Sequence, residues 1–452
     1  MSQSDSRGVP VSTNSRAALQ RLETATQLLA GYSGDPLGTI DTALASDPDF
    51  VMGHAFRAAI LVMSAERAAE DTLRPTVEAA EALLPNANAR ERAHVAAARA
   101  WLDRDFERAI ALYGTILFDW PRDLLALQVA HVGDFYLGQS SLLRDRIARV
   151  LPDWDDGVPG FGFVLAMHAF GLEETADYAR AEESGRRAVE LNPRDAWGVH
   201  AVAHVMEMQG RLPEGIDWLG KRVNDWAPDN MFAFHNWWHL ALYHLDLGET
   251  ARVLDLYDHS VRPKSSAVAL EMVDASALLW RLYLRDVDVG DRWKELAQSW
   301  APTATDGYYA FNDAHAAMAF IGDDRQPELD LLVRTLEQRA TGNDTNATMT
   351  RDVGLPLVRA LQAFAAGRYD RVVELLLPMR PVAHRFGGSH AQRDVISLTL
   401  IEAALRSKQA PMARALTAEC RSLKPSSPFN SQLWDRALRK AGDAASAQQA
   451  HK

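Results

Sequence analysis

The segment PRDAWGVHAVAHVMEMQGRLPEGIDWLGKRVNDWAP, residues 193–228, contains the pattern that decides the fold. It begins and ends with a proline, and Gly210 divides it into two amphipathic halves. Proline ends a helix because it cannot donate an interior backbone hydrogen bond and disfavours helix in the residue before it. Glycine permits the left-handed turn that follows many helices. The segment therefore predicts a helix, a tight turn and a second helix.

The same punctuation recurs along the chain at intervals of about 35 residues or twice that value. The prolines in this series are Pro48, Pro85, Pro121, Pro193, Pro228 and Pro263. A period of about 34 residues is typical of helix-turn-helix arrays. The units expected from it lie at about 90–123, 124–160, 162–195, 196–229 and 231–265, with a further clear one at 351–384. Gly138, Gly248 and Gly367 should end the first helix of their units as Gly210 does.

Small and aromatic residues keep the same phase within these units. The positions are Phe106, Ala109, Tyr113 and Pro121 in one unit, and Tyr178, Ala181, Ala188 and Pro193 in another. This arrangement resembles the tetratricopeptide repeat. The resemblance and the period predict an all-α fold, an α-α superhelix or solenoid of tandem tetratricopeptide-like hairpins over 17–440. We expect a disordered tail at 1–16 and a frayed tail at 441–452.

The composition narrows the partners and the compartment. The chain has 48 basic and 60 acidic side chains, and its net charge of −12 disfavours nucleic acid and anionic lipid as partners. No apolar run is long enough to span a membrane. Cys420 is the single cysteine, so an internal disulfide framework is excluded. These features, with a polar opening that lacks a secretion signal, predict a cytoplasmic protein.

Two successive first helices carry histidine pairs on one face. His200, His204 and Glu207 fall at i, i+4 and i+7, and His235 and His239 again lie four residues apart. First helices of such arrays line the concave surface, so the first pair should point into a groove. The register of the second pair depends on whether it is counted from Pro228 or from Gly248.

Histidines in this pattern suit two kinds of chemistry. Neutral imidazole binds divalent transition metals, which makes His200, His204, His235 and His239 candidate ligands. Imidazole and carboxylate also serve as acid and base, which makes His204, Glu207 and His239 candidate catalytic residues. The structural alternative is that these histidines pack between crowded helices, with their ring nitrogens bonded to neighbouring carboxylates.

Further inward positions are candidates for contact with a ligand. Those expected to bind it are His200, His235, Trp238, His131, Asp134, Asp313 and His315. Trp238 stands out among the tryptophans of this region because it lies between two histidines and could floor an apolar pocket.

The segments DAWGVHAVAHVMEMQGR and NMFAFHNWWHLALYHLDLGE resemble tetratricopeptide repeat protein 38 and its bacterial relatives. The matching residues are His200, His204, Glu207, His235, Trp238, His239, Ala241 and Tyr243. The resemblance implies a cytosolic repeat protein of a widely distributed family, and it supplies no catalytic assignment.

Two functional hypotheses remain open from the sequence. In the first, the chain binds a protein partner or a small ligand in a concave groove lined by His, Trp and acidic residues. In the second, it is a small-molecule enzyme of the hydrolase, lyase or isomerase type that uses His and Glu as acid and base, or a bound metal, in the same cavity. The sequence does not identify a cofactor, and a divalent transition metal is the candidate that these histidines suggest.

Overall fold

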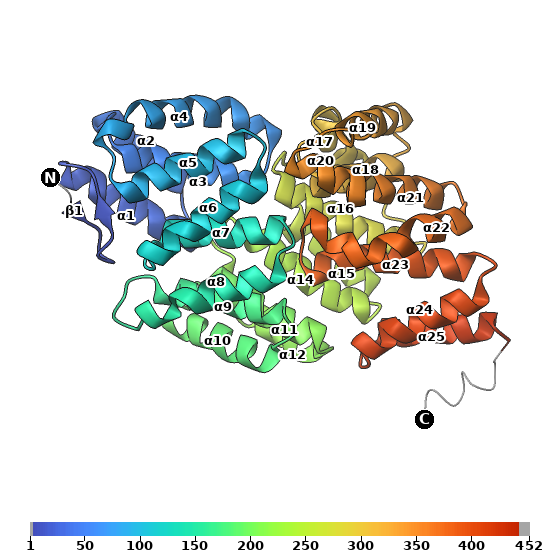
Figure 1. Cartoon of the computed structure of the whole chain (residues 1–452). Coiled ribbons are helices and arrows are strands. Elements are labelled where there is room, and N and C mark those ends of the chain that lie inside the picture. The colour runs from blue at the N-terminus through green and yellow to red at the C-terminus, as the bar shows by residue number, and fades with distance from the viewer. Residues whose placement is uncertain (1–2, 443–452) are drawn as a thin grey trace. The chain divides into compact units, whose positions relative to one another are not determined.

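Tandem helix hairpins make up the fold, as the sequence predicts. The computed structural model describes residues 3–442, and apart from one short pair of strands its regular elements are helices (Figure 1). None of the helices between residues 3 and 442 combines the length and the apolar composition that a bilayer crossing requires.

The helices gather into two compact units. The first unit contains the chain up to Val202 together with Arg222–Ala233 and Asp344–Asn346, and the second contains Ala203–Lys221, Phe234–Asn343 and the chain from Ala347 onward. The expected single array over 17–440 is thus divided, and the division passes through one continuous helix, α11 (Ala196–Met208).

The first unit is built from successive complete hairpins, with the start of α11 and short pieces that return from later in the chain. Its elements are β1 (Gln3–Ser4), β2 (Pro10–Val11), α1 (Arg16–Ala30), α2 (Pro36–Ser46), α3 (Val51–Ser64), η1 (Arg67–Ala69), α4 (Glu70–Ala82), η2 (Leu84–Asn86), α5 (Ala89–Leu102), α6 (Phe106–Asp119), α7 (Leu124–Tyr136), α8 (Ser140–Val150), η3 (Leu151–Asp153), α9 (Phe161–Glu173), α10 (Tyr178–Leu191) and α13 (Val223–Trp226).

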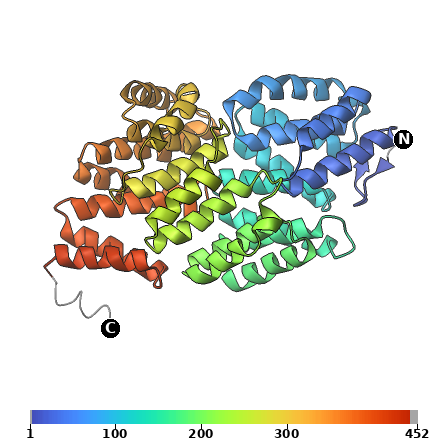
Figure 2. The ribbon, with the colours of Figure 1, turned by 180° about the vertical axis from the view of Figure 1, so that it is seen from behind.

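The second unit continues the pattern with the rest of α11. Its further elements are α12 (Leu212–Gly220), α14 (Ala233–Asp246), α15 (Thr250–Leu256), η4 (Tyr257–Val261), α16 (Ala269–Tyr283), α17 (Arg292–Trp300), η5 (Ala301–Thr303), α18 (Ala310–Gly322), α19 (Gln326–Arg339), α20 (Thr345–Met349), η6 (Thr350–Gly354), α21 (Leu355–Ala365), α22 (Tyr369–Met379), η7 (Arg380–Phe386), α23 (His390–Arg406), α24 (Ala410–Leu423) and α25 (Pro428–Lys440). Figure 2 shows the helices of this unit from behind, with α14 to α16 in yellow-green.

The prolines and glycines that mark the repeat lie at the helix ends and turns that the sequence predicts. Each proline of the series lies between the end of one hairpin and the start of the next. The four predicted turn glycines have left-handed backbones, with φ of +64° at Gly138, +68° at Gly210, +79° at Gly248 and +68° at Gly367. In other hairpins the same left-handed position holds a residue with a side chain, such as Ala176 with φ of +63°.

Small residues let the two helices of a hairpin approach closely. Ala109, Ala181 and Ala188 are completely buried, as the repeat pattern predicts. Gly171 of α9 allows an equally close approach between neighbouring hairpins, because a methyl group there would lie 2.4 Å from the carbonyl oxygen of Leu143 in α8. The core therefore forms between neighbouring helices along the whole array.

The opening residues differ from the expected disordered tail at 1–16. Residues 3–11 form a small antiparallel hairpin in which Gln3 pairs with Val11, and Val11 is completely buried. This segment is held by α5, since the carbonyl oxygen of Pro10 accepts a hydrogen bond from Arg90 Nε at 3.0 Å. Most of the expected tail at 441–452 lies outside the described residues.

The connection at 222–233 belongs to the first unit, although the chain on both sides of it belongs to the second. Helix α12 ends early, at Gly220, and the following chain packs back on the loop after α1. The backbone N–H of Met231 donates to the carbonyl oxygen of Tyr32 at 2.7 Å, and Ser33 forms an isolated bridge with Asn230. This connection thus belongs to the first unit, while the hairpin that precedes it continues into the second.

Candidate functional site

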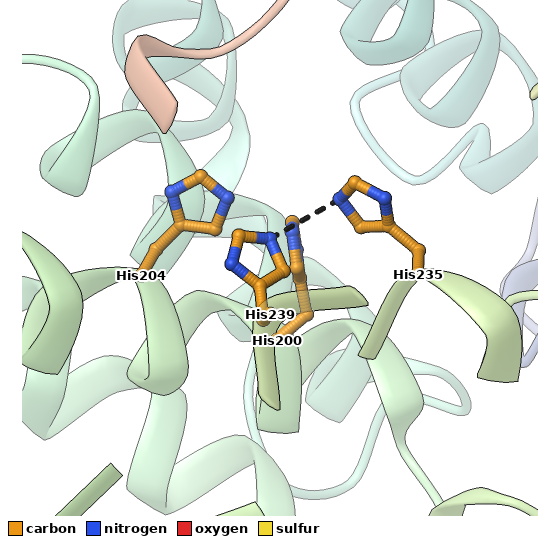
Figure 3. A group of neighbouring side chains, drawn as sticks. All are labelled: His200, His204, His235 and His239. Atoms are coloured by element: carbon orange, nitrogen blue, oxygen red, sulfur yellow. Dashed lines mark hydrogen bonds between the residues drawn. The ribbon is translucent and has the colours of Figure 1, made fainter. Parts of the chain in front are cut away.

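Two consecutive first helices place four imidazoles together. Helix α11 carries His200 and His204 and helix α14 carries His235 and His239, each pair one helical turn apart (Figure 3). One ring nitrogen from each of the four lies within 4.8 Å of the others, and the residues are between 0% and 7% exposed. The register that the sequence left ambiguous is therefore the one in which His235 and His239 face the α11 pair.

Carboxylates hold the α14 histidines. Asp274 of α16 lies 2.6 Å from His235 Nδ1 through Oδ2, and Glu207 of α11 lies 3.0 Å from His239 Nδ1 through Oε2. An ionised carboxylate only accepts hydrogen bonds, so both Nδ1 atoms carry the proton. In a neutral imidazole the Nε2 atom then carries a lone pair and no proton.

The Nε2 atoms of His235 and His239 lie close together. His235 Nε2 and His239 Nε2 are 3.2 Å apart, as the dashed line in Figure 3 marks. Two lone pairs at this distance repel unless a proton or a metal cation lies between them. Burial, and next the positive character of His204, lower the pKa of His239 well below its usual value, which disfavours a proton on His239 Nε2.

Aromatic stacking fixes the ring planes. The His235 ring stacks on Trp238 with centroids 5.3 Å apart and an angle of 13°, and the His204 ring is 4.4 Å from that of His239. The guanidinium carbon of Arg281 lies 5.3 Å from the centre of the Trp238 ring. Trp238 is completely buried, and its ring supports that of His235.

A lysine from the C-terminal hairpin completes the site. Lys424 Nζ lies 3.2 Å from Glu207 Oε1. Burial alone would raise the pKa of Glu207, but Lys424 and the hydrogen bond from His239 outweigh it and hold this pKa below its usual range. Glu207 is therefore an anion shared between an ammonium group and an imidazole.

The remaining sequence candidates lie elsewhere in their units. Asp134 is buried in an ion pair with Arg146, and burial raises its pKa to about 6. His131 packs edge-on against Trp197 with centroids 5.7 Å apart, and burial lowers its pKa to about 3. Both are part of the interior of the first unit.

The two candidates from α18 are also interior residues. His315 Nδ1 donates to the carbonyl oxygen of Phe311 at 2.7 Å, and burial lowers its pKa to about 4. Asp313 is 5% exposed, and burial raises its pKa to about 8. Neither belongs to the histidine cluster.

Sequence reasoning missed two contributors to the site. Asp274 lies at an inward position of α16, yet nothing in the sequence indicates that it pairs with His235. Lys424 lies 217 residues after Glu207, and no local pattern marks it. A buried carboxylate one hairpin further on is the signal that could have identified Asp274, because metal-binding histidines commonly donate their second N–H to a carboxylate.

Comparison with known proteins extends no further than the fold. No family model matches the chain. It is similar to a chain of the APC/C hetero-tetramer Cut9–Hcn1, at 11% identity and a TM-score of 0.46, over 92% of this chain and 69% of that one. Human IFIT1 gives 10% identity and a TM-score of 0.40 over 95% of this chain and 93% of its own. Yeast Tom70 is 12% identical, with a TM-score of 0.31, over 96% of this chain and 95% of its own.

Proposed function

We propose that this chain is a helical-repeat binding scaffold in which His200, His204, His235 and His239 hold a divalent transition metal ion. The observation that carries the proposal is the pair of Nε2 atoms 3.2 Å apart, each on a ring whose Nδ1 is bound to a carboxylate. Ligands around a tetrahedral zinc ion, with Zn–N distances of about 2.05 Å, are separated by about 3.3 Å.

The second sphere fits the same ion. In metal sites the second N–H of a ligand histidine is commonly held by a carboxylate, which fixes the tautomer and raises the basicity of the ligand atom. Asp274 and Glu207 are placed to do this for His235 and His239. Four imidazole ligands without an added thiolate suit zinc, copper or nickel better than magnesium or calcium.

The role we propose for the ion is structural. Four protein ligands close a tetrahedral site, and the cluster is buried, so the ion would join α11 to α14. Asp274 extends this connection to α16, the first helix of the next hairpin. A scaffold tied across three successive hairpins offers its partner, a protein or a small ligand, a surface of fixed shape.

The test is metal content of tag-free protein by inductively coupled plasma mass spectrometry. We expect one equivalent of zinc, or of another transition metal, in the wild type and less than a tenth of that in His204→Ala/His239→Ala. His259→Ala is the matched control, because His259 has a side chain that is 74% exposed and lies outside the cluster. The double variant must keep its helical circular dichroism.

Absence of metal from the wild type, even after incubation with zinc and gel filtration, would overturn the proposal. The cluster would then be a metal-free site in which His204, Glu207 and His239 exchange protons, and a screen for hydrolase, lyase or isomerase activity would follow. Equal metal in the wild type and the double variant would place the ion elsewhere.

We also propose that the chain belongs to the tetratricopeptide repeat protein 38 family and acts in the cytoplasm. The family proposal rests on the two segments that carry the cluster, and its test is whether a family member loses bound metal when the histidines matching His204 and His239 are replaced. The location rests on a single cysteine, Cys420, and cell fractionation tests it.

A further inference from the structure

The buried metal site needs a path by which an ion enters and leaves. The four histidines are at most 7% exposed, so some segment must move to let the ion pass. The candidate is the chain at 424–430, which we call the latch. It contains the connection between α24 and α25 and the first residues of α25. Its first residue, Lys424, reaches Glu207, and Glu207 holds His239.

Polar contacts fasten the latch to α14. Ser427 Oγ donates to Asp246 Oδ1 at 2.6 Å, and the backbone N–H of Phe429 donates to the same oxygen at 3.2 Å. Arg285, in the turn after α16, adds a cation–π contact, with its guanidinium carbon 3.5 Å from the centre of the Phe429 ring. Each fastening is a single residue pair.

Little apolar surface supports these contacts. Leu423, directly before the latch, is 74% exposed, and Pro425 and Ser426 are also exposed. Segments with few buried apolar side chains and exposed backbone open at a lower free energy than the core. The latch also lies close to the turn between α11 and α12. A methyl group at Gly210 in that turn would lie 3.1 Å from Ser426 Cβ.

We propose that the latch is a gate that sets how fast the metal ion enters and leaves the histidine cluster. The proposal rests on the metal site proposed above. The fastening at Asp246 touches none of the metal ligands, so it is equally present with and without the ion. Its loss should therefore speed entry and exit by the same factor and leave the equilibrium affinity unchanged.

The test uses full-length protein loaded with Zn²⁺. Release is followed by transfer to excess chelator, entry by stopped flow with a chromogenic zinc indicator, and affinity by competition. Ser427→Ala removes one of the two hydrogen bonds to Asp246 and Asp246→Ala removes both, and Ser422→Ala is the matched control on exposed α24 surface. We expect both rates to rise about tenfold in the two latch variants, the factor that one hydrogen bond to a charged group supplies.

The outcomes separate this proposal from the one on which it rests. Wild-type protein that binds no zinc overturns both. Wild-type protein that binds zinc, with release rates in both latch variants within twofold of the wild type, overturns the gate alone. A weaker affinity with an unchanged entry rate also overturns it, because the latch would then be part of the binding site.

Discussion

Replacing Asp274 with Asn should weaken metal binding without weakening the fold. Asp274 is 1% exposed and holds His235 Nδ1 at 2.6 Å. An asparagine side-chain oxygen can still accept from this N–H, so the change replaces a charge-assisted hydrogen bond with a neutral one. The difference between the two kinds of bond is about 1.4 kcal/mol, which corresponds to about tenfold in affinity.

The effects on binding and on stability should differ. Without metal, Asp274→Asn removes the cost of burying a carboxylate but also takes an anion away from the buried Arg281, so the free energy of unfolding should change little. With metal at a fixed excess, the stabilisation given by the ion should fall by about 1.4 kcal/mol. Urea unfolding with zinc and with chelator measures both quantities, and zinc competition measures the affinity directly.

The control is Asp258→Asn, an aspartate that pairs with Arg292 near the surface and lies outside the histidine cluster. It should leave zinc affinity within twofold of the wild type. Wild-type affinity in Asp274→Asn would refute the reasoning, because His235 would then need no carboxylate to act as a ligand.

Three further predictions concern stability. Gly171→Ala should destabilise the first unit by about 3 kcal/mol in urea unfolding, since its methyl group meets the backbone at Leu143 and Arg144 and no side chain can move aside. Ala176→Gly should stabilise the same unit by about 0.5–1 kcal/mol, because it relieves a left-handed alanine at φ +63°, and an unchanged midpoint would contradict this. Burial raises the pKa of Asp313 to about 8, so the folded state binds its proton more tightly than the unfolded state and stability should fall as the pH rises from about 4 to about 8. Asp313→Asn should flatten this fall in unfolding midpoints measured at about pH 5 and about pH 7.5, and an equal slope in both proteins would show that another group causes it.

The hairpins could be predicted because their signals are local. Proline stops a helix and glycine turns the chain through their own covalent structures, whatever the rest of the fold does. The spacing of His200 and His204 likewise fixes a shared helix face. These local rules and the equivalence of first helices made the four histidines candidates for one site, but they left the register of the second pair open.

The partners of these histidines could not be predicted because they depend on tertiary packing. Asp274 meets His235 from the next hairpin, and Lys424 meets Glu207 only after the chain has returned from its C-terminal hairpin. The division into two units was equally hidden. It passes through α11 and places the connection at 222–233 with the first unit, and no sequence motif marks either feature.

The pairing of Ser33 with Asn230 has a consequence for how the protein is made. The loop after α1 leaves the ribosome long before its partner exists, and at about 10 residues per second the delay is about 20 s. The first unit waits longer still for the hydrogen bond between the backbone N–H of Glu107 and Thr345 Oγ1. During synthesis the N-terminal hairpins therefore lack the contacts with residues 230 and 345 that complete the first unit. This interval is the stage at which chaperones would act on the chain.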